Sequence, residues 1–397
     1  MNELMEMCEK VVCNTYARYP VVFERGAGCR LWDTEGKEYM DFLAGIAVCN
    51  LGHSHPEVAR VVCEQARKLV HVSNLFYTRP QVELASELIR RSFADKVFFA
   101  NSGAEANEAA IKLARKYSRD KYGPGRFHII TMKDSFHGRT LATLSATGQE
   151  KVHKGFDPLV EGFRFVPYNS VEAVEQAVTE KTCAVLVEPI QGEGGVRPGD
   201  ASYFRALREL CTAKDLLLIF DEVQTGMGRT GSLFAYEQLG VTPDVMTLAK
   251  ALGNGLPIGA MLATEEAARA FTPGSHASTF GGTPLVTAAS AKVLEIISKE
   301  DFLADVREKG RYFLGRLQDL QAKHPDKILD ARGRGLMLGL ELSRPGKTVV
   351  DRCLERGFVI NCTHDTVLRF VPPLIVTREE IDRLVETLDA VLKEWEE

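Results

Sequence analysis

A lysine and an upstream aspartate are the residues of this chain best placed to do chemistry. Asp221 directly follows the apolar run Leu216–Phe220. Lys250 ends a second strand-like run, Asp244–Ala249, and a glycine-rich stretch follows it. Charged residues at the carboxyl ends of neighbouring strands are typical of a site on an open α/β sheet. Desolvation lowers the pKa of a lysine amine among small residues, and a carboxylate can partner a pyridine nitrogen, so the pair predicts a pyridoxal 5'-phosphate (PLP) site.

The elements that must position these two residues belong to a repeating pattern of short apolar strands and longer amphipathic helices. Such alternation predicts an α/β fold with a mostly parallel central sheet. We assign this sheet to a large domain spanning residues 61–284. Its expected central strands are Lys96–Ala100, Phe127–Met132, Cys183–Val187, Leu216–Phe220 and Asp244–Ala249.

The two ends of the chain predict a second, smaller α+β domain. Residues 1–60 form its N-terminal part and hold a hairpin-like stretch with short strands at 21–25, 30–33 and 39–42. Residues 285–397 form its C-terminal part. Helical patterns cover Pro284–Lys299 and Phe302–Gln321, and the tail alternates helices with short strands at Met337–Leu342, Phe358–Ile360 and Val367–Phe370.

The composition limits the class of protein. The 397 residues are 45% hydrophobic and 26% charged, which is ordinary for a globular chain of about two or three domains. A net charge of −5 gives no electrostatic case for a nucleic-acid partner. No apolar run is long enough for a membrane span, and the N-terminus lacks the pattern of a signal peptide. Nine scattered cysteines without a CxxC pair favour the reducing cytoplasm over a disulfide framework.

The turn after the first central strand suits a phosphate. Ser102 and Glu105 have the spacing of a capping box, and small residues continue from Gly103 and Ala104 into a helical pattern. The free N–H groups and positive dipole end of such a helix bind anions. An ordinary strand-to-helix turn with a good cap explains this segment equally, and for an isolated segment it is the commoner case.

Two further loops offer polar and aromatic groups at strand ends. Phe136 can stack on a flat ring and Arg139 can bind a carboxylate, although a core aromatic beside a solvated arginine is the simpler explanation. His137 is a candidate general base, but a lone histidine is more often structural and we assign it no catalytic role. Glu188 and Glu193 can act as acid, base or metal ligand. We predict no metal, because no histidine or further carboxylate accompanies them at suitable spacing.

Taken in order, the motifs closely resemble those of the class III PLP-dependent aminotransferases. The resemblance covers nearly the whole chain, and its motifs are specific when taken together. It implies the PLP-dependent transferase fold type I and a homodimer with active sites shared at the subunit interface. The segments that carry it are WDTEGKEYMDFLAGIAVCNLGHSHP, ANSGAEANEAAIKLAR, SFHGRT, EPIQGEGG, DEVQTGMGRTG, AKALGNGLPIGA, HASTFGGTPL and LRFVPPLIV.

The resemblance implies a role in cofactor binding for several residues. Lys250 would hold PLP covalently and shuttle a proton, and Asp221 would keep the ring nitrogen protonated, which makes these two the catalytic residues. Thr279 would reach the phosphate from the partner subunit. The full set implied to bind the cofactor is Ser102, Gly103, Ala104, Phe136, Asp221, Glu222, Val223, Gln224, Lys250 and Thr279.

The resemblance also implies a set of substrate contacts. Arg139 would bind a substrate carboxylate. Glu193 and Arg369 would form an ion pair that stays closed with an acylated diamine and opens when glutamate is bound, so that neither charge is left buried alone. Ser278 and Tyr16 would lie on the substrate side of the site.

The implied reaction moves the terminal amine of N-acetylornithine to 2-oxoglutarate, as in arginine biosynthesis. Ile46 stands where ornithine-specific members carry a tyrosine, which counts against free ornithine. Ornithine and succinyl-diaminopimelate stay open as alternative donors. An alternative of another class is a glutamate-1-semialdehyde aminomutase, which would isomerise its substrate without 2-oxoglutarate.

Overall fold

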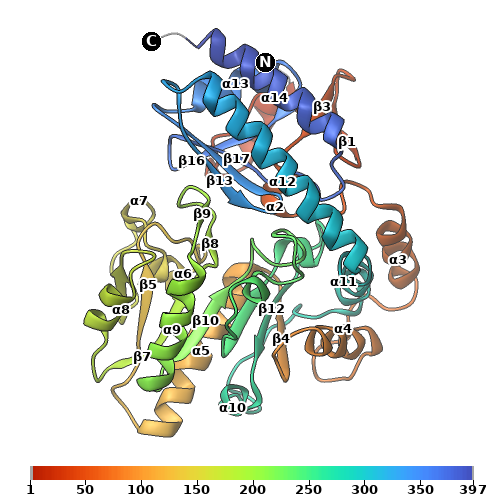
Figure 1. The fold of residues 1–397 in the computed structure, drawn as a ribbon. Helices are drawn as coiled ribbons and strands as arrows, with labels where there is room; N and C mark the ends of the chain where they lie inside the picture. The colour runs from red at the N-terminus through yellow and green to blue at the C-terminus, as the bar shows by residue number, and fades with distance from the viewer. Residues whose placement is uncertain (1–2, 396–397) are drawn as a thin grey trace.

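The computed structural model describes residues 3–395, and its centre is a seven-stranded sheet with the order β4-β12-β11-β10-β7-β5-β6 (Figure 1). Strand β12 is antiparallel to both of its neighbours, and the pairs from β11 to β6 are parallel. The sheet is therefore mostly parallel, as predicted. Its strands are β4 (Lys96–Ala100), β5 (His128–Met132), β6 (Phe163–Val166), β7 (Thr182–Val187), β10 (Leu217–Asp221), β11 (Val245–Leu248) and β12 (Gly259–Ala263).

Helices cover both faces of this sheet because its strands are apolar on both sides. Leu217 and Ile219 pack with the buried alanines of α5 (Gly103–Tyr122), whereas Leu218 and Phe220 pack on the opposite face with α9 (Ala201–Ala213). The alanines let α5 approach the sheet closely as it crosses from β4 towards β7. Shorter helices of this part are α6 (Leu141–Ala146), α7 (Glu150–His153), α8 (Val171–Ala177), η1 (Ala235–Gln238), η2 (Lys250–Leu252) and α10 (Glu265–Ala268).

The two chain ends share the second part of the molecule. Strand β15 (Phe358–Val359) pairs in parallel with β3 (Glu38–Asp41), which extends the N-terminal hairpin of β1 (Phe23–Ala27) and β2 (Arg30–Asp33). Beside it lies an antiparallel sheet, and the helices of this part pack over it (Figure 1). These elements are β13 (Ile328–Arg334), β14 (Met337–Leu342), β16 (Asn361–Thr363), β17 (Val367–Phe370), α12 (Glu300–Lys323), α13 (Lys347–Glu355) and α14 (Arg378–Lys393).

Helix α11 (Pro284–Ile297) leads from one part to the other and packs against α3 (Pro56–Ala66) and α4 (Arg79–Arg90). The expected domain boundary after residue 60 falls inside α3, and the boundary after residue 284 falls at the start of α11. Both boundaries stay predictions. The remaining elements are α1 (Glu3–Val11), α2 (Ala44–Ala47), β8 (Ile190–Gln191) and β9 (Arg197–Pro198). Within residues 3–395, no helix is both long and apolar enough to cross a membrane.

A buried arginine ties the two parts together. The Arg229 guanidinium donates to the carbonyl oxygens of Leu336, at 2.8 Å, and Pro372, at 2.6 Å, and to the side chain of Asn50. Burial lowers its pKa to about 9. Because its acceptors come from both chain ends, Arg229 fixes the small-domain strands over the carboxyl edge of the central sheet.

Candidate active site

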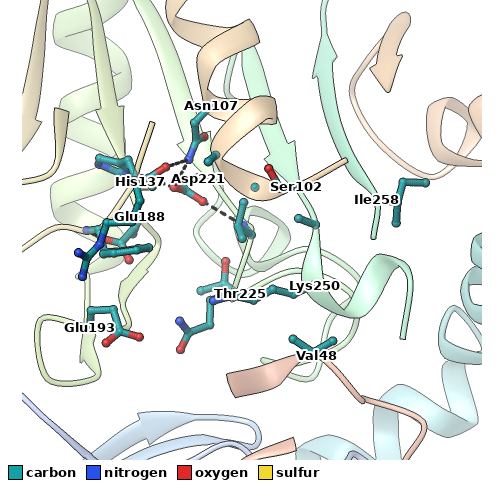
Figure 2. Close-up of a pocket in the computed structure, with 18 of the residues that line it drawn as sticks. Val48, Ser102, Asn107, His137, Glu188, Glu193, Asp221, Thr225, Lys250 and Ile258 are labelled. Carbon is teal, nitrogen blue, oxygen red and sulfur yellow. Dashed lines mark hydrogen bonds and ion pairs between the residues drawn. The ribbon is translucent and has the colours of Figure 1, made fainter. Parts of the chain in front are cut away.

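One cavity of about 430 Å³ lies at the carboxyl edge of the central sheet (Figure 2). Five strands that run in the same direction end at this edge, and the loop after each one contributes to the lining, as expected for an open α/β sheet. Predicted residues that line the cavity are Ser102, Gly103, Ala104, Phe136, Arg139, Glu193, Asp221, Val223, Gln224 and Lys250.

Lys250 begins the turn η2, just beyond the end of β11. Its φ of +46° lies in the left-handed region, which is uncommon for a residue with a side chain and often marks a functional site. The amine is buried in the cavity. Desolvation lowers its pKa below the usual value, with the nearby Glu193 carboxylate acting in the opposite direction. The site therefore favours an uncharged, nucleophilic amine at Lys250.

Asp221 ends β10 and is held by three donors. Its Oδ2 accepts hydrogen bonds from Asn107 Nδ2 at 2.7 Å and from His137 Nδ1 at 2.8 Å, and its Oδ1 accepts one from the Val223 N–H at 3.0 Å (Figure 2). Asn107 is itself fixed, because its Oδ1 accepts the hydroxyl of Thr247 at 2.7 Å. The carboxylate is buried and oriented, which suits a permanent charge partner for a cationic ring nitrogen.

The start of α5 forms an anion-binding turn. The Ser102 Oγ accepts the Glu105 N–H at 3.2 Å, which is the expected N-cap contact. The Glu105 carboxylate returns to the N–H of Asn101 instead of Ser102, so only half of the predicted capping box forms. In the described chain no acceptor takes the N–H groups of Gly103 and Ala104. These two donors stand free at the cavity wall for a phosphate.

Glu188 joins two loops that border the cavity. Its Oε2 accepts the Phe136 N–H at 3.1 Å and its Oε1 accepts the Gly192 N–H at 3.2 Å. Burial raises the pKa of Glu188 to about 7. The carboxyl group thus fixes the aromatic ring of Phe136 on one side and the loop that carries Glu193 on the other. The Arg139 guanidinium lies 5.7 Å from the centre of the Phe136 ring.

Glu193 and Arg369 form the ion pair that the sequence predicts. Arg369 Nη1 lies 2.5 Å from Glu193 Oε1 and 3.3 Å from Gln224 Oε1, and its Nε donates to Asn361 Oδ1 at 3.2 Å. The Arg369 side chain is fully buried, and its Nη2 has no partner among the described residues. Burial opposes the charge of Glu193, but Arg369 and then Lys250 hold the pKa of that carboxyl below its usual value.

The structure does not bring every predicted residue to the cavity. The Glu222 carboxylate lies outside the lining and accepts the N–H groups of Ala235 and Tyr236 at 2.6 and 2.8 Å, which is a structural role. Thr279 lines a separate hollow, and Tyr16 is exposed on the N-terminal arm. Ser278 contacts only the rim, through Asn101 at 3.3 Å. Nothing in residues 3–395 groups three or more metal-binding side chains.

Sequence reasoning missed the residues that orient the charged groups. Asn107 and His137 fix Asp221, and Asn361 with Thr363 surround the Glu193–Arg369 pair. For His137 a signal existed, because it follows a strand end beside Phe136. For the others, the contacts depend on how α5 and β16 pack, which their local sequence does not show.

The aminotransferase class III family model matches residues 11–392, so the chain belongs to that family. The acetylornithine aminotransferase of Caldanaerobacter subterraneus subsp. tengcongensis is 54% identical, over 97% of this chain and 98% of that protein. The solved N-acetylornithine aminotransferase of Stenotrophomonas maltophilia is 38% identical, with a TM-score of 0.85 and 98% of each chain covered. An ornithine aminotransferase of Toxoplasma gondii, crystallised with partial PLP occupancy, is 34% identical, with a TM-score of 0.94 over 99% of this chain and 95% of that one.

The chain is accordingly a PLP-dependent aminotransferase of fold type I, and its own residues fit that cofactor. A buried amine on Lys250, an oriented carboxylate on Asp221 and free N–H groups at Gly103 and Ala104 surround one cavity. Backbone packing confirms that the turn is built closely, because a Cβ on Gly103 would lie 2.7 Å from Val223 Cγ1. The similarity in fold extends to both acetylornithine and ornithine enzymes, so the donor must be argued from the site.

Proposed function

We propose that the chain transfers the terminal amine of N-acetylornithine to 2-oxoglutarate, giving N-acetylglutamate semialdehyde and glutamate, in arginine biosynthesis. The observation that carries this proposal is the closed Glu193–Arg369 pair beside the open Arg139. N-acetylornithine has one carboxylate, which needs one available cation. Glutamate has two, and the second needs Arg369 after its release from Glu193. Similarity to acetylornithine aminotransferases supports the same choice.

The residues divide the work as follows. PLP, when bound, supplies an electron sink for the carbon that loses a proton. Lys250 takes that proton, because desolvation lowers the pKa of its amine towards the working pH. Asp221 keeps a fixed negative charge opposite the ring nitrogen, with Asn107 and His137 holding its orientation. Arg139 binds a substrate carboxylate and so aligns the amine with Lys250.

The donor can be tested in half-reactions without 2-oxoglutarate. N-acetylornithine, ornithine, succinyl-diaminopimelate and 4-aminobutyrate are added separately to the purified holoenzyme, and the cofactor spectrum is followed. We expect the fastest conversion with N-acetylornithine, because Ile46 leaves no hydroxyl for a free α-amine and Arg139 holds the carboxylate. An equal or faster rate with ornithine would replace the proposal with an ornithine aminotransferase. Turnover of glutamate-1-semialdehyde without 2-oxoglutarate would indicate the aminomutase.

We also propose that the enzyme works as a homodimer in the cytoplasm. Segment 69–82 and the neighbouring residue Phe280 expose large apolar side chains, with Tyr77 fully exposed, Leu75 86% exposed and Phe280 61% exposed. Such a patch beside the loop that carries Thr279 suits a subunit interface. Asn74 fixes this loop to the patch through the carbonyl oxygens of Ser278 and Gly281. Nine free cysteines support a reducing compartment.

The shared site makes a prediction for mixed dimers. Lys250→Ala and Thr279→Ala homodimers should each be impaired, because every site then lacks one of the two residues. A hybrid of the two subunits has one site with both wild-type residues. Activity of the reconstituted hybrid, with two differently tagged subunits, should rise to about half of the wild-type value. Hybrids no more active than the better parent would contradict a contribution of Thr279 from the partner.

A further inference from the structure

Strand β16 lies against the Glu193–Arg369 pair and presents two polar side chains to it. Asn361 and Thr363 are two residues apart in the strand, so both side chains point to the same face. Asn361 lies directly opposite Arg369 in the ladder with β17, and its Oδ1 accepts from Arg369 Nε at 3.2 Å. Each member of the ion pair therefore has its own contact on β16.

The contact of Thr363 with Glu193 has two acceptors. The buried Thr363 hydroxyl donates to the Glu193 carbonyl oxygen at 2.6 Å and lies 3.5 Å from the Glu193 carboxylate oxygen Oε2. A threonine hydroxyl has only one proton to donate. In the closed state that proton serves the carbonyl, and the carboxylate is served by Arg369. The hydroxyl is thus within a small rotation of a second, charged acceptor.

Release of Arg369 creates a need for such a donor. When Arg369 turns to a substrate carboxylate, Glu193 loses its cationic partner, and an unpartnered charge beside a buried site is costly. The backbone of the Glu193 loop has an independent anchor in Arg332, which donates to the carbonyl oxygens of Gly195, at 2.7 Å, and Val196, at 3.1 Å. The Thr363 hydroxyl can therefore leave the Glu193 carbonyl while the loop stays in place.

We propose that Thr363 is the second partner of Glu193, and that its hydroxyl turns from the carbonyl to the carboxylate when Arg369 is released. Thr363 then determines how readily the pocket accepts a substrate with two carboxylates. It contacts neither substrate nor cofactor and is a positioning residue. This inference rests on the proposed function, because only an enzyme that alternates between one and two carboxylates needs Arg369 to be released.

The test compares Thr363→Val, which keeps the shape but removes the hydroxyl, with Thr363→Ser, which restores it. In single half-reactions of the holoenzyme, we expect kcat/KM for glutamate to fall about ten-fold in Thr363→Val, because one hydrogen bond to a charged group is lost. The N-acetylornithine half-reaction keeps the pair closed and should change by less than about two-fold, within the range of a neutral contact. Thr363→Ser should recover most of the glutamate rate.

A binding measurement gives a second readout that does not depend on turnover. Calorimetry with glutarate, a dicarboxylate without an amine or keto group, should show a Kd about ten-fold higher in Thr363→Val than in the wild type. The Kd of the monocarboxylate valerate should stay unchanged. Thr366→Val, on the same β-hairpin and with its hydroxyl on the carbonyl of His364, is the matched control and should alter neither ligand.

The outcomes separate the inference from the proposed function. Equal losses in both half-reactions, or an unchanged glutarate Kd, would show that Thr363 only supports the loop and would overturn the inference. A wild-type enzyme that does not react with N-acetylornithine would overturn the proposed function instead. The selective loss of glutamate turnover and glutarate binding, with rescue by serine, is the result that supports Thr363 as the second partner.

Discussion

Replacing Lys250 by alanine should reduce kcat by about 10,000-fold, the upper end of what a positioned acid–base group contributes. The loss follows from two properties of the residue. Its buried amine is the group of the cavity suited to bind PLP covalently, and its lowered pKa suits it to accept a proton from substrate carbon. Alanine removes both functions and leaves the walls of the cavity in place. Steady-state turnover and the absorbance of the bound cofactor measure the two losses separately.

The matched control for this variant is Lys116→Ala. Lys116 lies on the outer face of α5 and pairs with Asp120 at 2.7 Å, away from the cavity. Its loss should leave kcat unchanged, since a surface pair contributes at most about 1 kcal/mol to stability. Full activity in Lys250→Ala would remove the lysine from the mechanism. Exogenous methylamine should partly restore the rate if the missing group is the amine base.

The central sheet shows which structural features local sequence can predict. The expected strand Lys96–Ala100 coincides with β4, because a buried strand flanked by polar turns has a clear local signature. Strand β12 was not predicted, since Gly259–Ala263 follows a glycine- and proline-rich segment that has the composition of a loop. Strand β6 was missed for another reason. It is an edge strand, and its mixed burial weakens the apolar pattern.

The site shows the same division at the level of side chains. Lys250, Asp221 and Ser102 were predicted because each follows the end of a strand, and parallel strands bring their ends together. Asn107 was not, because it reaches Asp221 only through the path of α5 across the sheet. Thr363 reaches Glu193 across 170 positions of sequence. Contacts between domains of this kind depend on tertiary packing and have no local pattern.

Replacing Asp221 by asparagine should lower kcat by about 1,000-fold while PLP still binds, though more weakly. The side chain keeps its shape but loses the charge that balances a protonated ring nitrogen, and removal of one oriented electrostatic group commonly costs this much. It also places an amide near Asn107 Nδ2 and His137 Nδ1, which are donors that expect an acceptor. The measurements are single-turnover rates of proton removal, with deuterium at the reacting carbon, and the Kd of PLP.

The neighbouring acid Glu222 makes this prediction specific, because the two carboxylates are adjacent in sequence but point to different surroundings. Glu222 receives the N–H groups of Ala235 and Tyr236, and burial raises its pKa to about 7. Glu222→Gln should therefore lower the free energy of unfolding by about 1–3 kcal/mol, the cost of an unmatched buried hydrogen bond. The isotope effect and proton-removal rate of the folded enzyme should stay near wild type. If Glu222→Gln slowed proton removal as much as Asp221→Asn, the rate loss would come from disruption of this turn and not from the charge opposite the ring.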